Sequence, residues 1–228
     1  MANSSSILNE VQNDAFSELV NIAIGKAAAT LSLMIERKIL IQIPKIDLVK
    51  SEDLADRFIA LFGDRALGVT IRYTGLMSGA ATLFFEERDG RTLVDRLLSL
   101  HASDDWRDDW DSHKNDSQAE PEVPEQFSDS DKEAIIEVGN MLINALLGSV
   151  GNLIDVRFEY SVPELKMNYN FQNELARSEK YNAFFIETIF KDDEETIQGY
   201  LIMLFELGSF MDKFLSKLDQ MTSGEAFN

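Results

Sequence analysis

Apolar residues recur at helical spacing in two long segments of the chain. Within residues 10–35 they fall three or four positions apart, and this set comprises Phe16, Leu19, Val20, Ala23, Ala27, Leu31 and Met34. The spacing recurs after residue 128, where the set comprises Ile135, Ile136, Leu142, Ile143, Leu146 and Leu147. Because such spacing gathers apolar side chains on one face, it predicts two long amphipathic helices. The predicted N-cap pairs are Asn9 with Gln12 and Ser128 with Asp131.

Alternating patterns after each helix predict β-strands. The alternating apolar positions are Ile39, Ile41 and Ile43 in the first half and Val156, Phe158, Tyr160 and Val162 in the second. Pro44 and Pro163 are expected to end these strands, because proline lacks the amide donor that a sheet ladder uses. Further strands are predicted at 67–74, 78–86, 180–190 and 196–206, and short amphipathic helices at 88–101 and 207–221.

The two halves are related by an internal repeat. Glu18, Asn21 and Pro44 correspond to Glu137, Asn140 and Pro163 at an offset of 119 (137 − 18 = 140 − 21 = 163 − 44), and GAATLFFE from Gly79 corresponds to GYLIMLFE from Gly199 at an offset of 120. We therefore predict an α/β fold of the α+β type, in which two α-β-β-β-α units with pseudo-twofold symmetry form an antiparallel-rich sheet packed with two long helices. The expected single domain of residues 1–228 comprises repeat 1 (9–101), an insert (102–126), repeat 2 (127–221) and a tail (222–228).

Composition excludes several classes of function. A net charge of −19 disfavours nucleic acid and anionic membrane surfaces as partners. The chain has no cysteine and only two histidines, His101 and His113, so disulfides, thiolate metal sites and cysteine nucleophiles are excluded. Neither a signal peptide nor a membrane-inserted span is predicted, and we expect a cytoplasmic protein.

The insert at 102–126 holds nine acidic and two basic residues, and it therefore carries −7 of the total charge. One interpretation is a solvated connector between the repeats. The other is a short docking peptide, because Trp106 and Trp110 lie four residues apart among aspartates.

A polar stripe follows each predicted long helix. Steps of four, three and four residues place four side chains on one face of the first helix, namely Asp14, Glu18, Asn21 and Gly25. The corresponding positions of the second helix are Glu133, Glu137, Asn140 and Asn144. Each stripe is either a solvated face or a site. Asparagine and glycine are poor helix formers, so their repetition favours a site in which a glutamate pairs with a partner's cation while the amide orients a water molecule.

The spacing Asp14-x3-Glu18-x2-Asn21-x22-Pro44 resembles the signature of the CheC family of response-regulator phosphatases, which also includes CheX and FliY. Its repeat, Glu133-x3-Glu137-x2-Asn140-x22-Pro163, is similar. This resemblance implies removal of the phosphoryl group from the aspartate of phosphorylated CheY. It further implies that Glu18 and Glu137 contact the regulator's lysine while Asn21 and Asn140 orient the attacking water. The Mg²⁺ would be held by the regulator, so no cofactor or metal is expected on this chain, and CheD is implied as a candidate second partner.

The second copy departs from the family pattern. Glu133 stands where the family usually has aspartate or serine, and it could instead form a capping box with Ser130. Asn144 replaces the glycine at position 25 of the first copy, and Lys26 could either pair with an acidic regulator or make the face more soluble. The alternative function is a non-catalytic adaptor, because the fold implied is also similar to the middle domain of the flagellar switch protein FliM.

Overall fold

The computed structural model describes residues 8–34, 36, 38–63, 66–98, 127–169, 181–191, 196–206 and 209–223. The insert at 102–126, both histidines and residues 224–228 of the tail lie outside the described residues, and so do the predictions made for them. The first half contains α1 (Glu10–Met34), β1 (Leu40–Lys50), α2 (Ser51–Phe62), β2 (Ala66–Thr74), β3 (Gly79–Glu86) and α3 (Glu87–Leu98). The second half contains α5 (Asp129–Leu153), β4 (Glu159–Tyr160), β5 (Glu164–Lys166), β6 (Tyr181–Lys191), β7 (Thr196–Glu206) and α7 (Ser209–Thr222).

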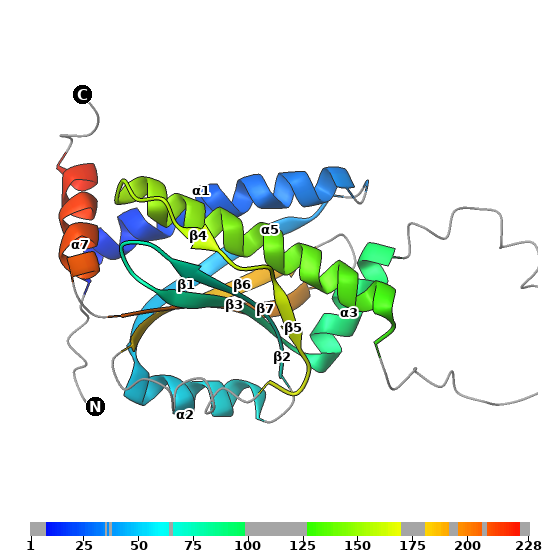
Figure 1. Cartoon of the computed structure of the whole chain (residues 1–228). Coiled ribbons are helices and arrows are strands. Elements are labelled where there is room, and N and C mark those ends of the chain that lie inside the picture. Colours follow the sequence, from blue (N-terminus) through cyan, green and yellow to red (C-terminus); the bar gives the residue numbers. More distant parts are fainter. Residues whose placement is uncertain are drawn as a thin grey trace, which may run out of the picture.

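The predicted α+β fold class is confirmed. The protein has three layers, with one antiparallel sheet between two layers of helices. Helices α1 and α5 lie over one face of the sheet, α2 covers the opposite face, and α3 and α7 flank the long helices (Figure 1). The larger apolar core lies beneath α1 and α5 and includes Phe16, Leu146 and Phe184. A smaller core beneath α2 includes Leu54, Phe58 and Phe84. The two long helices thus each bury one face and leave the other toward solvent.

The strand order confirms the predicted pseudo-twofold symmetry. The order is β1-β6-β7-β3-β2-β4, and β5 also pairs with β2. At the centre, Gly79 of β3 pairs with Phe205 of β7, while Phe85 of β3 pairs with Gly199 of β7. Since 79 + 120 = 199 and 85 + 120 = 205, the two pairs exchange when the repeats are exchanged. A pseudo-twofold axis therefore passes between β3 and β7.

The two repeats are interleaved. β1 of the first repeat pairs with β6 of the second, and β4 and β5 of the second repeat pair with β2 of the first. The helices interleave in the same way, because α1 packs against α7 and α5 packs against α3. The repeat boundaries that the sequence predicts at 9–101 and 127–221 remain predictions.

Both predicted N-caps are present. The Asn9 amide donates to Gln12 Oε1 at 3.0 Å while the Gln12 amide donates to Asn9 Oδ1 at 2.9 Å. Ser128 and Asp131 form the equivalent reciprocal pair at α5, with distances of 2.7 and 3.2 Å. Each pair satisfies two backbone donors at a helix start, so the local sequence fixes where both long helices begin.

Three features of the strands and helices differ from the prediction. Pro44 does not end a strand: it lies inside β1, at a register shift between Gln42 and Lys45, and this is tolerated because β1 is an edge strand. The run at 156–162 forms only the two-residue β4, and Pro163 separates β4 from β5. Helix α2 was not predicted, although Leu54, Phe58, Leu61 and Phe62 follow helical spacing.

Helix α5 is long and apolar enough, by length and composition, to cross a bilayer. Half of the apolar window is buried inside the protein, and Glu133 and Glu137 lie on its exposed face. These features make α5 a core helix of the layered fold.

Candidate functional site

The first polar stripe lies on the solvent side of α1. Asp14, Glu18, Asn21 and Gly25 are all exposed, while Phe16 and Val20, on the opposite face of the helix, are fully buried. A Cβ atom added to Gly25 would meet no atom within 4 Å, so no contact inside the described protein requires glycine there. Glycine in a helix interior costs about 1 kcal/mol relative to alanine, which makes close approach by a partner the simplest reason for it.

The second stripe lies on α5 and is less open. Glu133 and Glu137 are exposed, whereas Asn140 and Asn144 are partly buried. The structure excludes the alternative capping role of Glu133, because Ser128 is the N-cap, Asp131 completes the capping box and Ser130 lies within the helix. Both predicted stripes are therefore continuous helix faces with an outward glutamate three residues before an asparagine.

The two asparagine side chains are held differently. Asn21 Nδ2 donates to the Ser17 carbonyl on its own helix at 2.9 Å. Asn140 Oδ1 instead accepts from Asn144 Nδ2 at 2.8 Å. The equivalent of Asn144 in the first repeat is Gly25, since 25 + 119 = 144, and glycine can provide no such donor.

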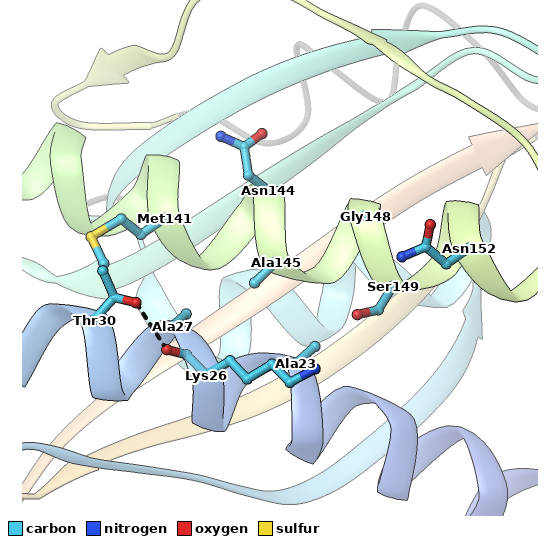
Figure 2. A pocket seen from close by; sticks show the side chains of 10 residues that line it. All are labelled: Ala23, Lys26, Ala27, Thr30, Met141, Asn144, Ala145, Gly148, Ser149 and Asn152. Atoms are coloured by element: carbon cyan, nitrogen blue, oxygen red, sulfur yellow. Dashed lines mark hydrogen bonds between the residues drawn. The ribbon is translucent and has the colours of Figure 1, made fainter.

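The stripes lie on either side of the pseudo-twofold axis. Helices α1 and α5 run in opposite directions (Figure 1), and the repeat-equivalent residues Lys26 and Ala145 face each other across the groove between them (Figure 2). Asn21 and Asn140 each precede these residues by five positions. At 1.5 Å per residue, the two asparagines lie roughly 15 Å apart along the helix axes. The two asparagines are therefore two separate candidate sites and not one composite centre.

A shallow groove of about 420 Å³ runs between α1 and α5. Small side chains and hydroxyl or amide groups dominate its lining, with Lys26 as the cation and Asn144 at the edge of the second stripe (Figure 2). Its residues are Ala23, Lys26, Ala27, Thr30, Met141, Asn144, Ala145, Gly148, Ser149 and Asn152. The surface between the two sites is therefore smooth, and a docked protein could approach both helices closely.

Gly139 explains why Asn140 lies deeper than Asn21. A Cβ atom at position 139 would lie 2.6 Å from Cβ and Cγ1 of Val69 on β2. The equivalent position on α1 is the fully buried Val20 (139 − 119 = 20). Glycine thus lets α5 lie directly on the sheet, and the next residue, Asn140, lies closer to the protein interior than Asn21 does.

We expect opposite stability changes from the same substitution at two positions of α5. Gly139→Ala should destabilise the protein by about 1–2 kcal/mol, because the clash with Val69 outweighs the gain in helix propensity. Gly148→Ala, at a position where an added Cβ meets nothing within 4 Å, should stabilise it by about 1 kcal/mol. Urea denaturation of the two variants measures both changes, and equal stabilisation by both would contradict the close packing of α5 on β2.

The other predicted supporting residues lie away from the helix stripes. Pro44 is on the edge strand β1, and Pro163 lies between β4 and β5. The sequence analysis did not single out Ile22, an apolar residue beside Asn21 that is 53% exposed in the structure. Its position directly after the stripe residue Asn21 is the sequence feature that could have indicated it. Within the described ranges, no group of three or more histidine, aspartate or glutamate residues could hold a metal ion.

Comparisons with known proteins find similarity to two flagellar proteins, FliY and the FliM middle domain. No protein-family model matches the chain. A segment of 91 residues is 26% identical to the flagellar motor switch phosphatase FliY of Bacillus subtilis (strain 168), and it represents 40% of this chain but only 23% of that protein. The crystal structure of Thermotoga maritima FliY matches with a TM-score of 0.65 and 17% identity, over 94% of this chain and 98% of that one. The FliM middle domain from H. pylori matches with a TM-score of 0.56 and 12% identity, over 92% and 99%.

Proposed function

We propose that this chain, whose fold is similar to those of FliY and the FliM middle domain, is a phosphatase acting on the phospho-aspartate of a CheY-type response regulator. The observation that supports this most is the glutamate–asparagine pair on the outer face of each of two rigid helices, with both glutamates and Asn21 exposed and Asn140 partly buried. In this proposal Glu18 and Glu137 dock the regulator's active-site lysine, and Asn21 and Asn140 orient the attacking water.

Hydrolysis of an aspartyl phosphate requires a water molecule in line with the bond that breaks. Positioning and electrostatic stabilisation supply most of the catalysis in phosphoryl transfer, so a single well-placed amide is sufficient machinery on this side of the complex. Helices α1 and α5 provide that placement, because their buried faces are fixed in the large core. We propose that the Mg²⁺ is held by the regulator and that the complex forms in the cytoplasm.

The protein's charge affects how docking would occur. At −19 the chain repels an acidic regulator at long range, so association should depend on local pairing between the outward glutamates and a lysine. Gly25, Ala29 and Gly148 leave the surface around this contact low enough for a partner's loop to reach it. CheD as a second partner remains a prediction.

The test is the decay of a phosphorylated CheY-type regulator, measured with Mg²⁺ in the presence and absence of the protein. We expect substoichiometric amounts of the protein to accelerate the decay, and the decay rate to rise in proportion to the protein concentration. Binding of the regulator without faster decay would contradict the phosphatase.

A second candidate is a non-catalytic adaptor. It is favoured by the likeness to FliM middle domains, because a FliM has been crystallised in a complex with FliG. Binding of a FliG-type protein without any effect on regulator decay would support this candidate. The asparagine three residues after the glutamate in each stripe is the feature that an adaptor leaves unexplained.

A further inference from the structure

The asparagine side chains of the two candidate sites are oriented in opposite ways, so that Asn21 turns its Oδ1 atom outward and Asn140 turns its Nδ2 atom outward. The Ser17 carbonyl can only accept a hydrogen bond, so the Asn21 group facing it at 2.9 Å is the NH₂. The Oδ1 atom of Asn21 consequently lies on the side away from the helix backbone. Since Asn21 is exposed, the first stripe offers its Oδ1 atom as a hydrogen-bond acceptor to a docked partner.

The second site shows the reverse arrangement. Asn144 Nδ2 donates to Asn140 Oδ1 at 2.8 Å, so that oxygen faces Asn144 and one of its two lone pairs is engaged. Among the described residues, Asn140 Nδ2 has no hydrogen-bond partner. Both side chains are partly buried on α5, so the bond between them is shielded from competing water more than an exposed one is. The second stripe therefore offers a hydrogen-bond donor.

This difference matters for the chemistry proposed above. An attacking water must direct a lone pair at phosphorus, and a carbonyl that accepts one of its hydrogens favours that orientation. An NH₂ group donates to the water oxygen instead and competes with phosphorus for the lone pair. The same NH₂ suits a phosphoryl oxygen, which is an acceptor. A donor-presenting site should thus bind a phosphorylated regulator but turn it over slowly.

We propose, on the basis of the proposed function, that Asn144 is a positioning residue that holds Asn140 in its donor-outward orientation and makes the first site the faster one. At either site the water oxygen forms a bond to phosphorus, and the bond between phosphorus and the aspartate oxygen breaks. The electron pair of that bond stays on the regulator's carboxylate. Both water hydrogens remain with the product, dihydrogen phosphate, which then releases a proton to solvent.

The experiment isolates the second site with Asn21→Ala and then changes residue 144. Steady-state decay of the phosphorylated regulator gives kcat and KM for Asn21→Ala alone and for Asn21→Ala combined with Asn144→Gly. Removing the donor frees Asn140 Oδ1, so kcat should rise by about tenfold. KM should change by less than about threefold, because the docking glutamate Glu137 is unaltered.

Two further variants separate the direction of the hydrogen bond from simple packing at residue 144. Asn144→Asp provides only acceptors, so Asn140 must turn its NH₂ inward and its Oδ1 outward; kcat should rise, while KM rises because the new charge repels the phosphoryl group. Asn144→Lys provides only donors, so kcat should stay at the level of Asn21→Ala alone. A residue that acted only through packing would not give this split between kcat and KM.

The outcomes distinguish this inference from the proposed function. If the wild-type protein accelerates decay but Asn144→Gly and Asn144→Asp leave kcat unchanged, the positioning role is wrong and the phosphatase stands. Equal losses from Asn21→Ala and Asn140→Ala in the wild-type background would also overturn the positioning role. If the wild-type protein binds a beryllofluoride-activated regulator without accelerating decay of the phosphorylated form, the phosphatase fails and the positioning role fails with it. Circular dichroism of each variant excludes loss of the fold as the cause of a low rate.

Discussion

Replacing both Asn21 and Asn140 with alanine should abolish the acceleration of regulator dephosphorylation. Each substitution removes the amide that is proposed to orient water, and neither removes a buried apolar contact, since Asn21 is exposed and Asn140 is only partly buried. Loss of a single positioning group typically reduces turnover by about 10²-fold, so the double variant should be indistinguishable from spontaneous decay. The measurement is single-turnover decay of the phosphorylated regulator with Mg²⁺ and excess protein.

The matched control is Asn13→Ala, the same substitution on the same helix. Asn13 immediately precedes Asp14 and therefore points about 100° away from the stripe around the helix axis. Its variant should keep wild-type activity. The double variant should also keep its affinity for a beryllofluoride-activated regulator within a few-fold, because Glu18 and Glu137 remain in place. Full activity of the double variant would refute the assignment of both asparagines.

The sequence predicted the candidate site more fully than it predicted the sheet. Helical periodicity places Glu18 and Asn21 opposite Phe16 and Val20, and burial of the apolar face then determines that the polar face is exposed. Both N-caps were also readable, because each depends on side chains only three residues apart. Such features depend on local geometry alone.

Sheet edges depend on partners that are distant in sequence. Val162 belongs to a clear alternating run, yet it is 76% exposed, because only a short segment around Tyr160 pairs with β2. Pro44 could stay within a strand because the sheet places β1 at an edge. The alternation itself contains no information about which strand lies alongside.

The difference between the two candidate sites could not be predicted from the sequence and became visible only in the structure. The spacing of Asn140 and Asn144 shows that their side chains can meet, since residues four apart are neighbours on a helix. Which amide donates, and how closely Gly139 lets α5 approach Val69, follow only from the packed structure. The resemblance to CheC-type phosphatases therefore predicted the two candidate sites, and the hydrogen bonds of Asn21 and Asn140 distinguish them.

We expect Phe184→Ala to cause a large loss of stability. Phe184 is fully buried, and its ring lies 4.6 Å from Phe16 of α1, 4.9 Å from Phe205 of β7 and 5.2 Å from Phe214 of α7, measured between ring centroids. Removing a buried phenylalanine side chain costs about 3–5 kcal/mol through lost burial and the cavity that remains. Because domains of this kind are stable by about 5–15 kcal/mol, the free energy of unfolding should fall by roughly a fifth or more.

This cluster joins the two repeats and supports the first site. Phe16 belongs to the first repeat and lies between Asp14 and Glu18 on the opposite face of α1, while Phe184 and Phe214 belong to the second. Urea denaturation should therefore show one cooperative transition at a lower midpoint, with no separate unfolding of a half. Leu33→Ala is the control, because Leu33 is 82% exposed and its loss should change stability by no more than about 0.5 kcal/mol. Two separate transitions in Phe184→Ala would mean that each repeat keeps its own core, in contradiction to the interleaved strands.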